Sequence, residues 1–287
     1  MRHVVADQHD GDAARPHVQD QIQHAAAFLD AKRCRRFVQD DDAAAEGRGA
    51  GDGNALAPTD FGNDMFSVAH YGLPALDPLT IETPPSTVGT WVFGTDGADT
   101  MLGAGGTDMI QAGAGNDTVS AGAGNDSVQG GDGNDLLRGG SGNDLLQGQA
   151  GQDSLFGDEG NDSLLGGAGN DLLQGGAGSD LLAGGAGADM LWGGAERAQR
   201  DVFVFNSPGE SRLGALRDRI GDFRPGTDFL EIKADLNGNG LKSASQVLGT
   251  ATTDADSNAV LHLGGGVEIV LIGVHASDLK ADMIHMN

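Results

Sequence analysis

The chain has 287 residues, with 42 Asp and Glu against 17 Lys and Arg, so its formal charge is −25. This balance argues against nucleic acids and anionic membrane surfaces as partners, because both attract Lys and Arg, and no apolar run approaches the roughly 18 residues that span a bilayer. With 49 glycines, 5% aromatic residues and one cysteine, which cannot form an internal disulfide, the composition fits either a disordered chain or a fold whose charge is neutralised by bound cations.

The first 90 residues lack any strong pattern. Residues 1–55 are predicted to be an irregular or disordered leader with one candidate helix over 17–38, whose apolar residues share a face. Residues 56–90 contain most of the prolines and are predicted to be a linker. No apolar segment of a cleavable secretory peptide is visible near the start of the sequence.

Residues 91–192 repeat with a period of nine. In every unit a glycine stands two residues before an aspartate, and an aliphatic residue or Met stands two residues after it. The aspartates in this phase are Asp99, Asp108, Asp117, Asp126, Asp135, Asp144, Asp153, Asp162, Asp171, Asp180 and Asp189. The full unit, as in Gly166–Gln174, reads G-G-x-G-x-D-x-U-x, where U is the aliphatic residue.

This pattern predicts a loop followed by a short strand. Glycine permits positive φ angles and a close approach of backbone carbonyls, and the alternation of a strand buries U on one side. A single unit buries too little to fold alone, so stacked units must form a continuous apolar ladder. A flexible linker would have no reason to hold U in phase with Gly and Asp.

The nonapeptide resembles the calcium-binding repeat of RTX (hemolysin-type) proteins. The resemblance implies an all-β fold, a right-handed parallel β-roll (a β-solenoid), in which two repeats complete one coil. Aspartates stacked about 4.8 Å apart, the spacing of neighbouring strands, repel by about 3.5 kcal/mol per pair at an effective dielectric constant of about 20. Calcium accepts carboxylate and carbonyl oxygens in flexible geometry. A Ca²⁺ ion between coils would therefore remove the repulsion.

The resemblance also implies a ligand set. All eleven aspartates would bind Ca²⁺, together with carbonyls of the glycine-rich loops, at about nine sites if every pair of stacked repeats is occupied. The loop glycines that we assign to these sites are Gly131, Gly133, Gly140, Gly142, Gly167, Gly169, Gly176, Gly178, Gly185 and Gly187.

Residues 193–287 are predicted to form a β cap. Asp201–Phe205 alternates like a strand, and residues 218–228 are similar to the D-x-I-x-D-F-x-x-G-x-D signature of the serralysin C-terminal domain. Asp222 and Asp228 either bind further calcium or are surface carboxylates of the cap. The large apolar residues that would close the end of the ladder are Phe203, Phe205, Phe223 and Phe229.

Three further motifs follow. Residues 235–246 match the first half of an EF-hand loop, but Gln246 replaces the expected bidentate Glu, which favours an Asn-Gly turn between strands. Residues 259–263 and 267–272 flank three glycines and predict a hairpin. Residues 273–284 resemble the uncleaved signal at the end of type I secretion substrates, and the alternative is that they form only the edge of the cap.

No catalytic motif is present: H-E-x-x-H, G-x-S-x-G and G-x-x-x-x-G-K-[ST] are all absent. We therefore expect a non-enzymatic, secreted (extracellular) calcium-binding protein that folds on calcium after export by the type I secretion apparatus. We expect no nucleic-acid partner and no stable membrane insertion. The alternatives are a detached accessory or secretion module of an RTX enzyme, such as a serralysin-like protease or an alginate epimerase, or a surface adhesin with a polysaccharide or cell-surface target.

Overall fold

A computed structural model describes residues 65–67, 79–82, 89–194, 199–206, 217–238 and 240–287, the first two ranges by their backbone only. The predicted leader 1–55, its candidate helix 17–38 and Cys34 lie outside these residues. In the described part, no helix is both long and apolar enough to cross a membrane.

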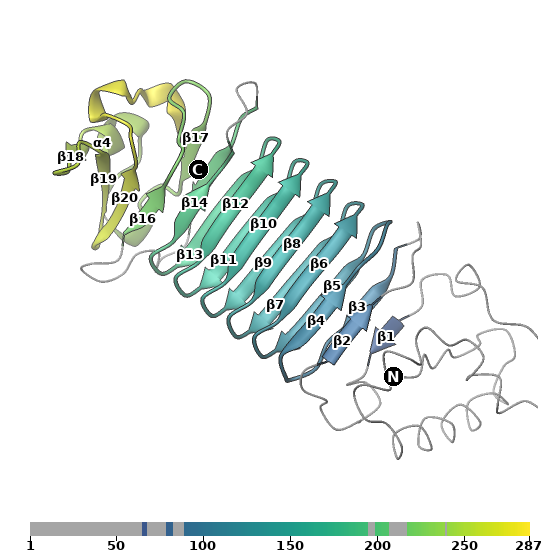
Figure 1. Cartoon of the computed structure of the whole chain (residues 1–287). Coiled ribbons are helices and arrows are strands. Elements are labelled where there is room, and N and C mark those ends of the chain that lie inside the picture. The colour runs from purple at the N-terminus through teal and green to yellow at the C-terminus, as the bar shows by residue number, and fades with distance from the viewer. Residues whose placement is uncertain (1–64, 68–78, 83–88, 195–198, 207–216, 239) are drawn as a thin grey trace, which may run out of the picture.

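The strands form two mainly parallel sheets, and from β1 to β18 successive strands alternate between them (Figure 1). The 10-stranded sheet contains β1 (Met65–Ser67), β3 (Trp91–Phe93), β5 (Met109–Ala114), β7 (Ser127–Asp132), β9 (Leu145–Ala150), β11 (Ser163–Ala168), β13 (Leu181–Ala186), β15 (Val202–Phe205), β17 (Phe229–Ile232) and β21 (Ile284–Met286), in that order. The 11-stranded sheet contains β2 (Leu79–Glu82), β4 (Asp99–Leu102), β6 (Thr118–Ala123), β8 (Leu136–Ser141), β10 (Ser154–Glu159), β12 (Leu172–Ala177), β14 (Met190–Trp192), β16 (Asp218–Ile220), β20 (Val267–Leu271), β19 (Ala259–Gly264) and β18 (Thr252–Thr253).

One coil of the solenoid takes two repeats. Leu155 of β10 pairs in register with Leu137 of β8 on one side and with Leu173 of β12 on the other, 18 residues away in each direction. This confirms the predicted β-roll. The strands are longer than the expected x-U-x, since β12 spans six residues. The first residues of each following glycine-rich loop extend the pairing, as Asp158 does opposite Gly176.

The second position of the unit shows why glycine is preferred there. Gly176 and Gly185 adopt φ angles of 107° and 102°, in the left-handed region that other residues rarely enter. Gln149 and Asp158 replace glycine at the same position and adopt φ angles of 81° and 73°. These two loops therefore carry backbone strain that the full motif avoids.

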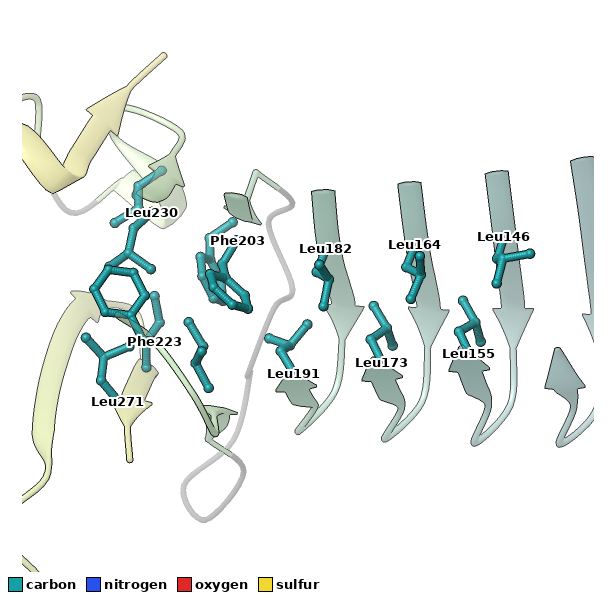
Figure 2. Close-up of a cluster of buried hydrophobic side chains, with 14 of the residues drawn as sticks. Leu146, Leu155, Leu164, Leu173, Leu182, Leu191, Phe203, Phe223, Leu230 and Leu271 are labelled. Atoms are coloured by element: carbon teal, nitrogen blue, oxygen red, sulfur yellow. The ribbon is translucent and has the colours of Figure 1, made fainter. Parts of the chain in front are cut away.

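The aliphatic residues form the predicted ladder. Those of the eleven repeats, from Met101 to Leu191, are 0–1% exposed. Figure 2 shows leucines of the two sheets pointing toward one another across the interior, with Phe203 and Phe223 where the rows end. Full burial of each such side chain stabilises the fold by about 1.5–3 kcal/mol, so the ladder is the main apolar core of the roll.

The cap continues both sheets. Strands β15, β17 and β21 extend one sheet, β16 and β20 extend the other, and β19 pairs antiparallel with β20 as the predicted hairpin. The rings of Phe203 and Phe223 are buried with centroids 6.1 Å apart.

The prediction was wrong for Phe229, whose side chain is only partly buried. Its ring lies 4.6 Å from the Arg200 guanidinium and 4.6 Å from the His285 ring. Phe229 directly follows a buried aspartate and points outward, because alternation gives the inward position to Leu230, which is fully buried.

Two strands, β1 and β2, fall within residues 56–90, which we expected to be a linker. They pair in parallel with β3 and β4, so both sheets begin before the first repeat.

In the segment with EF-hand similarity, Gln246 belongs to helix α4 (Ala244–Leu248), and its Oε1 accepts the N–H of Lys242 at 2.8 Å. The Ser243 hydroxyl accepts the N–H of Gln246 and so caps the start of the helix. The structure also describes three short 3-10 helices, η3 (Leu236–Gly238), η4 (Ala276–Asp278) and η5 (Ala281–Met283). Asn239 lies outside the described residues.

Candidate metal centre

The eleven predicted aspartates lie in two buried rows, each residue at the turn that leads into a strand. All are 1–3% exposed. Asp108 and every second aspartate after it precede strands of the 10-stranded sheet, and Asp99 and the alternate ones precede strands of the other. Asp201 and Asp228 extend the first row and Asp218 the second, each 1% exposed.

The backbone holds each carboxylate against the neighbouring coil. Asp153 Oδ1 accepts the N–H of Asp135 at 2.9 Å, and Asp171 Oδ1 accepts the N–H of Asp153 at 2.8 Å. The same bond joins Asp189 to Asp218 across 29 residues. The chain between these two residues disrupts the nine-residue phase, which is why periodicity alone missed Asp218 as a member of the row.

The other oxygen of most carboxylates has no hydrogen-bond partner. In the described part of the chain this holds for the buried Oδ2 atoms of Asp117, Asp126, Asp135, Asp144, Asp153, Asp162, Asp171, Asp180 and Asp189. A buried carboxylate oxygen without a partner is costly. Nine such atoms, all in repeat phase, have the chemistry and placement of ligands for a cation, which isolated defects would not repeat.

Glycines at the first position of the unit keep space open beside these oxygens. A Cβ atom on Gly148 would collide with Asp153 Oδ2 and lie 2.6 Å from the carbonyl oxygen of Gly166 in the next coil. Gly157 stands in the same relation to Asp162 and Gly175. A carboxylate oxygen and a carbonyl oxygen thus both lie close to each first-position glycine, and such hard oxygen donors suit Ca²⁺ better than softer metals.

The calcium-site glycines predicted from the sequence did not include these first-position glycines, although they are the first glycine of the G-G-x-G consensus. The ten predicted glycines occupy the second and fourth positions and have φ angles between 102° and 155°. A Cβ on Gly176 or Gly178 would collide with a backbone carbonyl of the preceding coil. These glycines therefore allow neighbouring coils to stack closely. That their carbonyls bind calcium stays a prediction.

Burial raises the pKa of the nine repeat aspartates from Asp117 to Asp189. The pKa of Asp135 and Asp144 is about 6, and that of Asp171 and Asp180 about 7, against 3.8 for an ordinary aspartate. Desolvation is the main cause, the backbone N–H bonded to each carboxylate lowers the pKa, and carboxylates of stacked coils raise it further. Without a cation, these aspartates therefore become protonated at a higher pH in the folded rows than in the unfolded chain.

In chelator, we expect the roll to become more stable as the pH falls from about 7.5 to about 5. The raised pKa values mean that the folded chain binds protons that the unfolded chain, with a pKa of 3.8, leaves in solution. The free energy of unfolding therefore falls as pH rises from about 4 to about 7 and stays low above that range. Circular dichroism in chelator, with sedimentation to verify a monomer, measures this. A weaker strand signal at pH 5 than at pH 7.5 would contradict the pKa assignment.

The comparisons with known proteins agree with this geometry. Residues 93–128, 129–164 and 165–197 match the family model of the RTX calcium-binding nonapeptide repeat. No curated protein matches the chain at a significant level.

Two solved structures are similar in part. The extracellular lipase LipA from Serratia marcescens is 21% identical over 73% of this chain and 42% of the lipase, with a TM-score of 0.26. The AlgE6R3 subunit of the Azotobacter vinelandii mannuronan C5-epimerase is 29% identical over 53% of this chain and 77% of that subunit, with a TM-score of 0.27. The chain thus spans less than half the length of the lipase. The family match and the stacked aspartates together identify residues 93–197 as RTX calcium-binding nonapeptide repeats.

Proposed function

We propose that this chain is a secreted calcium-binding module whose roll folds when Ca²⁺ fills the rows between its coils. The observation that carries the proposal is the set of nine buried Oδ2 atoms, from Asp117 to Asp189, that lack a hydrogen-bond partner. Calcium would supply positive charge to these oxygens. The proposed ligands are the eleven repeat aspartates and carbonyls of the adjoining glycine-rich loops.

Charge makes the calcium-free roll unfavourable at neutral pH. Residues 94–192 contain 15 acidic residues and one basic residue, a net charge of −14. Stacked carboxylates repel one another, and the unfolded chain relieves this repulsion by separating and hydrating them. Because the sites exist only in the folded state, calcium binding and folding are coupled.

This coupling suits a chain that crosses from a calcium-poor to a calcium-rich compartment. Dissociation constants near 10⁻⁴–10⁻³ M, about those of other extracellular calcium modules, would leave the sites empty inside a cell and filled outside it. The chain would then pass an export channel unfolded and fold after release.

A calcium titration followed by circular dichroism tests the proposal. We expect little strand signal at pH 7.5 in chelator and a cooperative gain as calcium reaches about 0.1–1 mM. Magnesium at equal concentration is the control, because it holds its water shell and prefers stricter octahedral geometry. A full strand signal in chelator that calcium leaves unchanged would refute calcium-dependent folding.

We further propose that the chain has no catalytic domain of its own. One hydroxyl–imidazole–carboxylate series lies in the cap, where His262 Nε2 is 2.8 Å from Thr252 Oγ1 and His262 Nδ1 is 2.9 Å from Glu268 Oε1. The series is partly exposed on the face of β18, β19 and β20, and Glu268 also pairs with Arg217. Open to water, it serves to tie the three strands together.

Export by the type I apparatus is the remaining part of the proposal, and it rests on the similarity of residues 273–284 to known signals. Deleting residues 230–287 is expected to abolish secretion from a Gram-negative host that expresses the apparatus. A truncation that removes only residues 1–55 is the control and should leave export intact. Undiminished secretion of the first variant would contradict the proposal.

A further inference from the structure

The last coil of the roll contains a degenerate repeat that sequence periodicity does not reveal. Residues 223–231 place Gly226, with a φ angle of 87°, at the fourth position and the buried Asp228 at the sixth. Leu230 occupies the eighth position and is fully buried. The second position, where the consensus has glycine, is occupied by Arg224.

The Arg224 guanidinium lies between the carboxylates of two adjacent coils. Its Nη2 donates to Asp228 Oδ1 and to Asp201 Oδ2, both at 2.9 Å, and its Nε donates to Asp228 Oδ2 at 3.1 Å. Nη2 is also 2.9 Å from the carbonyl oxygen of Gln199. Two stacked carboxylates and a backbone carbonyl are the same types of ligand that we propose for calcium in the interior of the roll.

We propose that Arg224 is a resident cation that takes the place of calcium at the C-terminal end of the carboxylate row. The inference rests on the proposed function, because it places a side chain between two carboxylates of the same row, where the proposed function would place a calcium ion. The coils that carry Asp201 and Asp228 then fold without calcium. Their strands provide an edge on which the next coil can pair. Arginine suits this position because its planar guanidinium stays charged and bonds two carboxylates at once.

The N-terminal end is closed in a comparable way by neutral donors. Thr95, also at a second position, donates its N–H and its hydroxyl to Asp99 Oδ2 at 2.6 and 2.9 Å. Thr90 stands nine residues before Asp99, in the phase of the aspartates, and donates its N–H and hydroxyl to Asp108 Oδ1 at 2.7 and 2.9 Å. Side chains of the protein thus donate to carboxylate oxygens at the first aspartate of each row and at the last two of the row that ends at Asp228, and the nine Oδ2 atoms without a hydrogen-bond partner lie between these ends.

This arrangement assigns a direction to folding. In a solenoid each coil contacts only its neighbours, so a coil that is stable without calcium serves as the template for the rest. The C-terminal end has a cation and the aromatic residues Phe203 and Phe223, whereas the interior coils depend on calcium. Filling of the sites would therefore proceed from Asp180 and Asp189 toward Asp117.

Hydrogen exchange of the full chain in chelator at pH 7.5 tests the inference. In the wild-type protein we expect protected amides in β15 and β17 while β7 to β12 exchange freely. Arg224→Gln should lose the protection of β15 and β17 and raise the calcium midpoint of the strand signal by about threefold or more. Arg224→Lys keeps a cation and should stay within about twofold of the wild-type midpoint. Arg219→Gln, at the exposed middle position of β16, is the matched control for charge and should behave as the wild type.

Each outcome bears on the proposal. If Arg224→Gln has the amide protection and the calcium midpoint of the wild type, the proposal is overturned. It is also overturned if Arg224→Gln and Arg224→Lys are equally impaired, because that result would show that the side chain acts by packing rather than by charge. Failure of Arg224→Gln to fold at any calcium concentration, with Arg224→Lys folding normally, would support the need for a cation. The wild-type calcium response reports separately on the proposed function, and its absence would overturn both.

Discussion

Leu182→Ala in the calcium-loaded protein is expected to lower the free energy of unfolding by about 2–5 kcal/mol. Leu182 is fully buried in β13, near the end of the aliphatic ladder that meets the cap (Figure 2). Truncation removes favourable burial and leaves a cavity between coils that are held in register by their backbone bonds, so the site cannot collapse to fill it. Urea unfolding at saturating calcium measures the change.

Leu181→Ala is the matched control. Leu181 precedes Leu182 in the same strand and is 37% exposed, so its truncation should cost no more than about 0.5 kcal/mol. Equal losses from the two variants would show that β13 does not have the inward-outward alternation that the roll requires. A loss below about 1 kcal/mol for Leu182→Ala would show that the ladder is not the core.

Asp135→Asn is expected to have opposite effects with and without calcium. Asp135 Oδ2 is one of the buried oxygens without a partner, and the carboxylate lies between those of the neighbouring coils. Neutralising it removes a charged ligand, which should raise the calcium midpoint by about tenfold or more. In chelator the same change removes repulsion and desolvation, so the calcium-free roll should become more stable. Calcium titration and urea unfolding in chelator measure the two effects.

Asp132→Asn removes the same charge from the same loop. Asp132 is exposed, whereas Asp135 is 3% exposed. Its replacement should shift the calcium midpoint by less than about twofold, since exposed charges are well screened. Similar shifts in the two variants would mean that general charge, rather than the buried row, governs calcium binding.

The sequence was most informative where its period is strict. The phase of Gly, Asp and U predicted the loops, the strands and the buried ladder, and the resemblance to the RTX repeat added the two-repeat coil and the two rows of aspartates. Leu155, for example, pairs with residues 18 positions before and after it, and Val119 pairs in the same register.

Prediction failed where the period breaks. Asp218 joins its row 29 residues after Asp189, a separation that the nine-residue period does not predict. Phe229 was placed in the core because of its apolar character, but its position next to Asp228 turns it outward. The repeat consensus does not predict the contacts of Arg224. Its partner Asp201 is 23 residues away in the sequence, and only the coiling of the chain brings the two side chains together.

The position of calcium in a crystal of the calcium-loaded protein tests the central claim most directly, because anomalous scattering at long wavelength identifies the ion itself. We expect anomalous peaks between successive coils, next to Oδ2 of the aspartates from Asp117 to Asp189, and none between Asp201 and Asp228, where Arg224 lies. Peaks confined to exposed carboxylates such as Asp132, with the buried rows free of metal, would contradict the account.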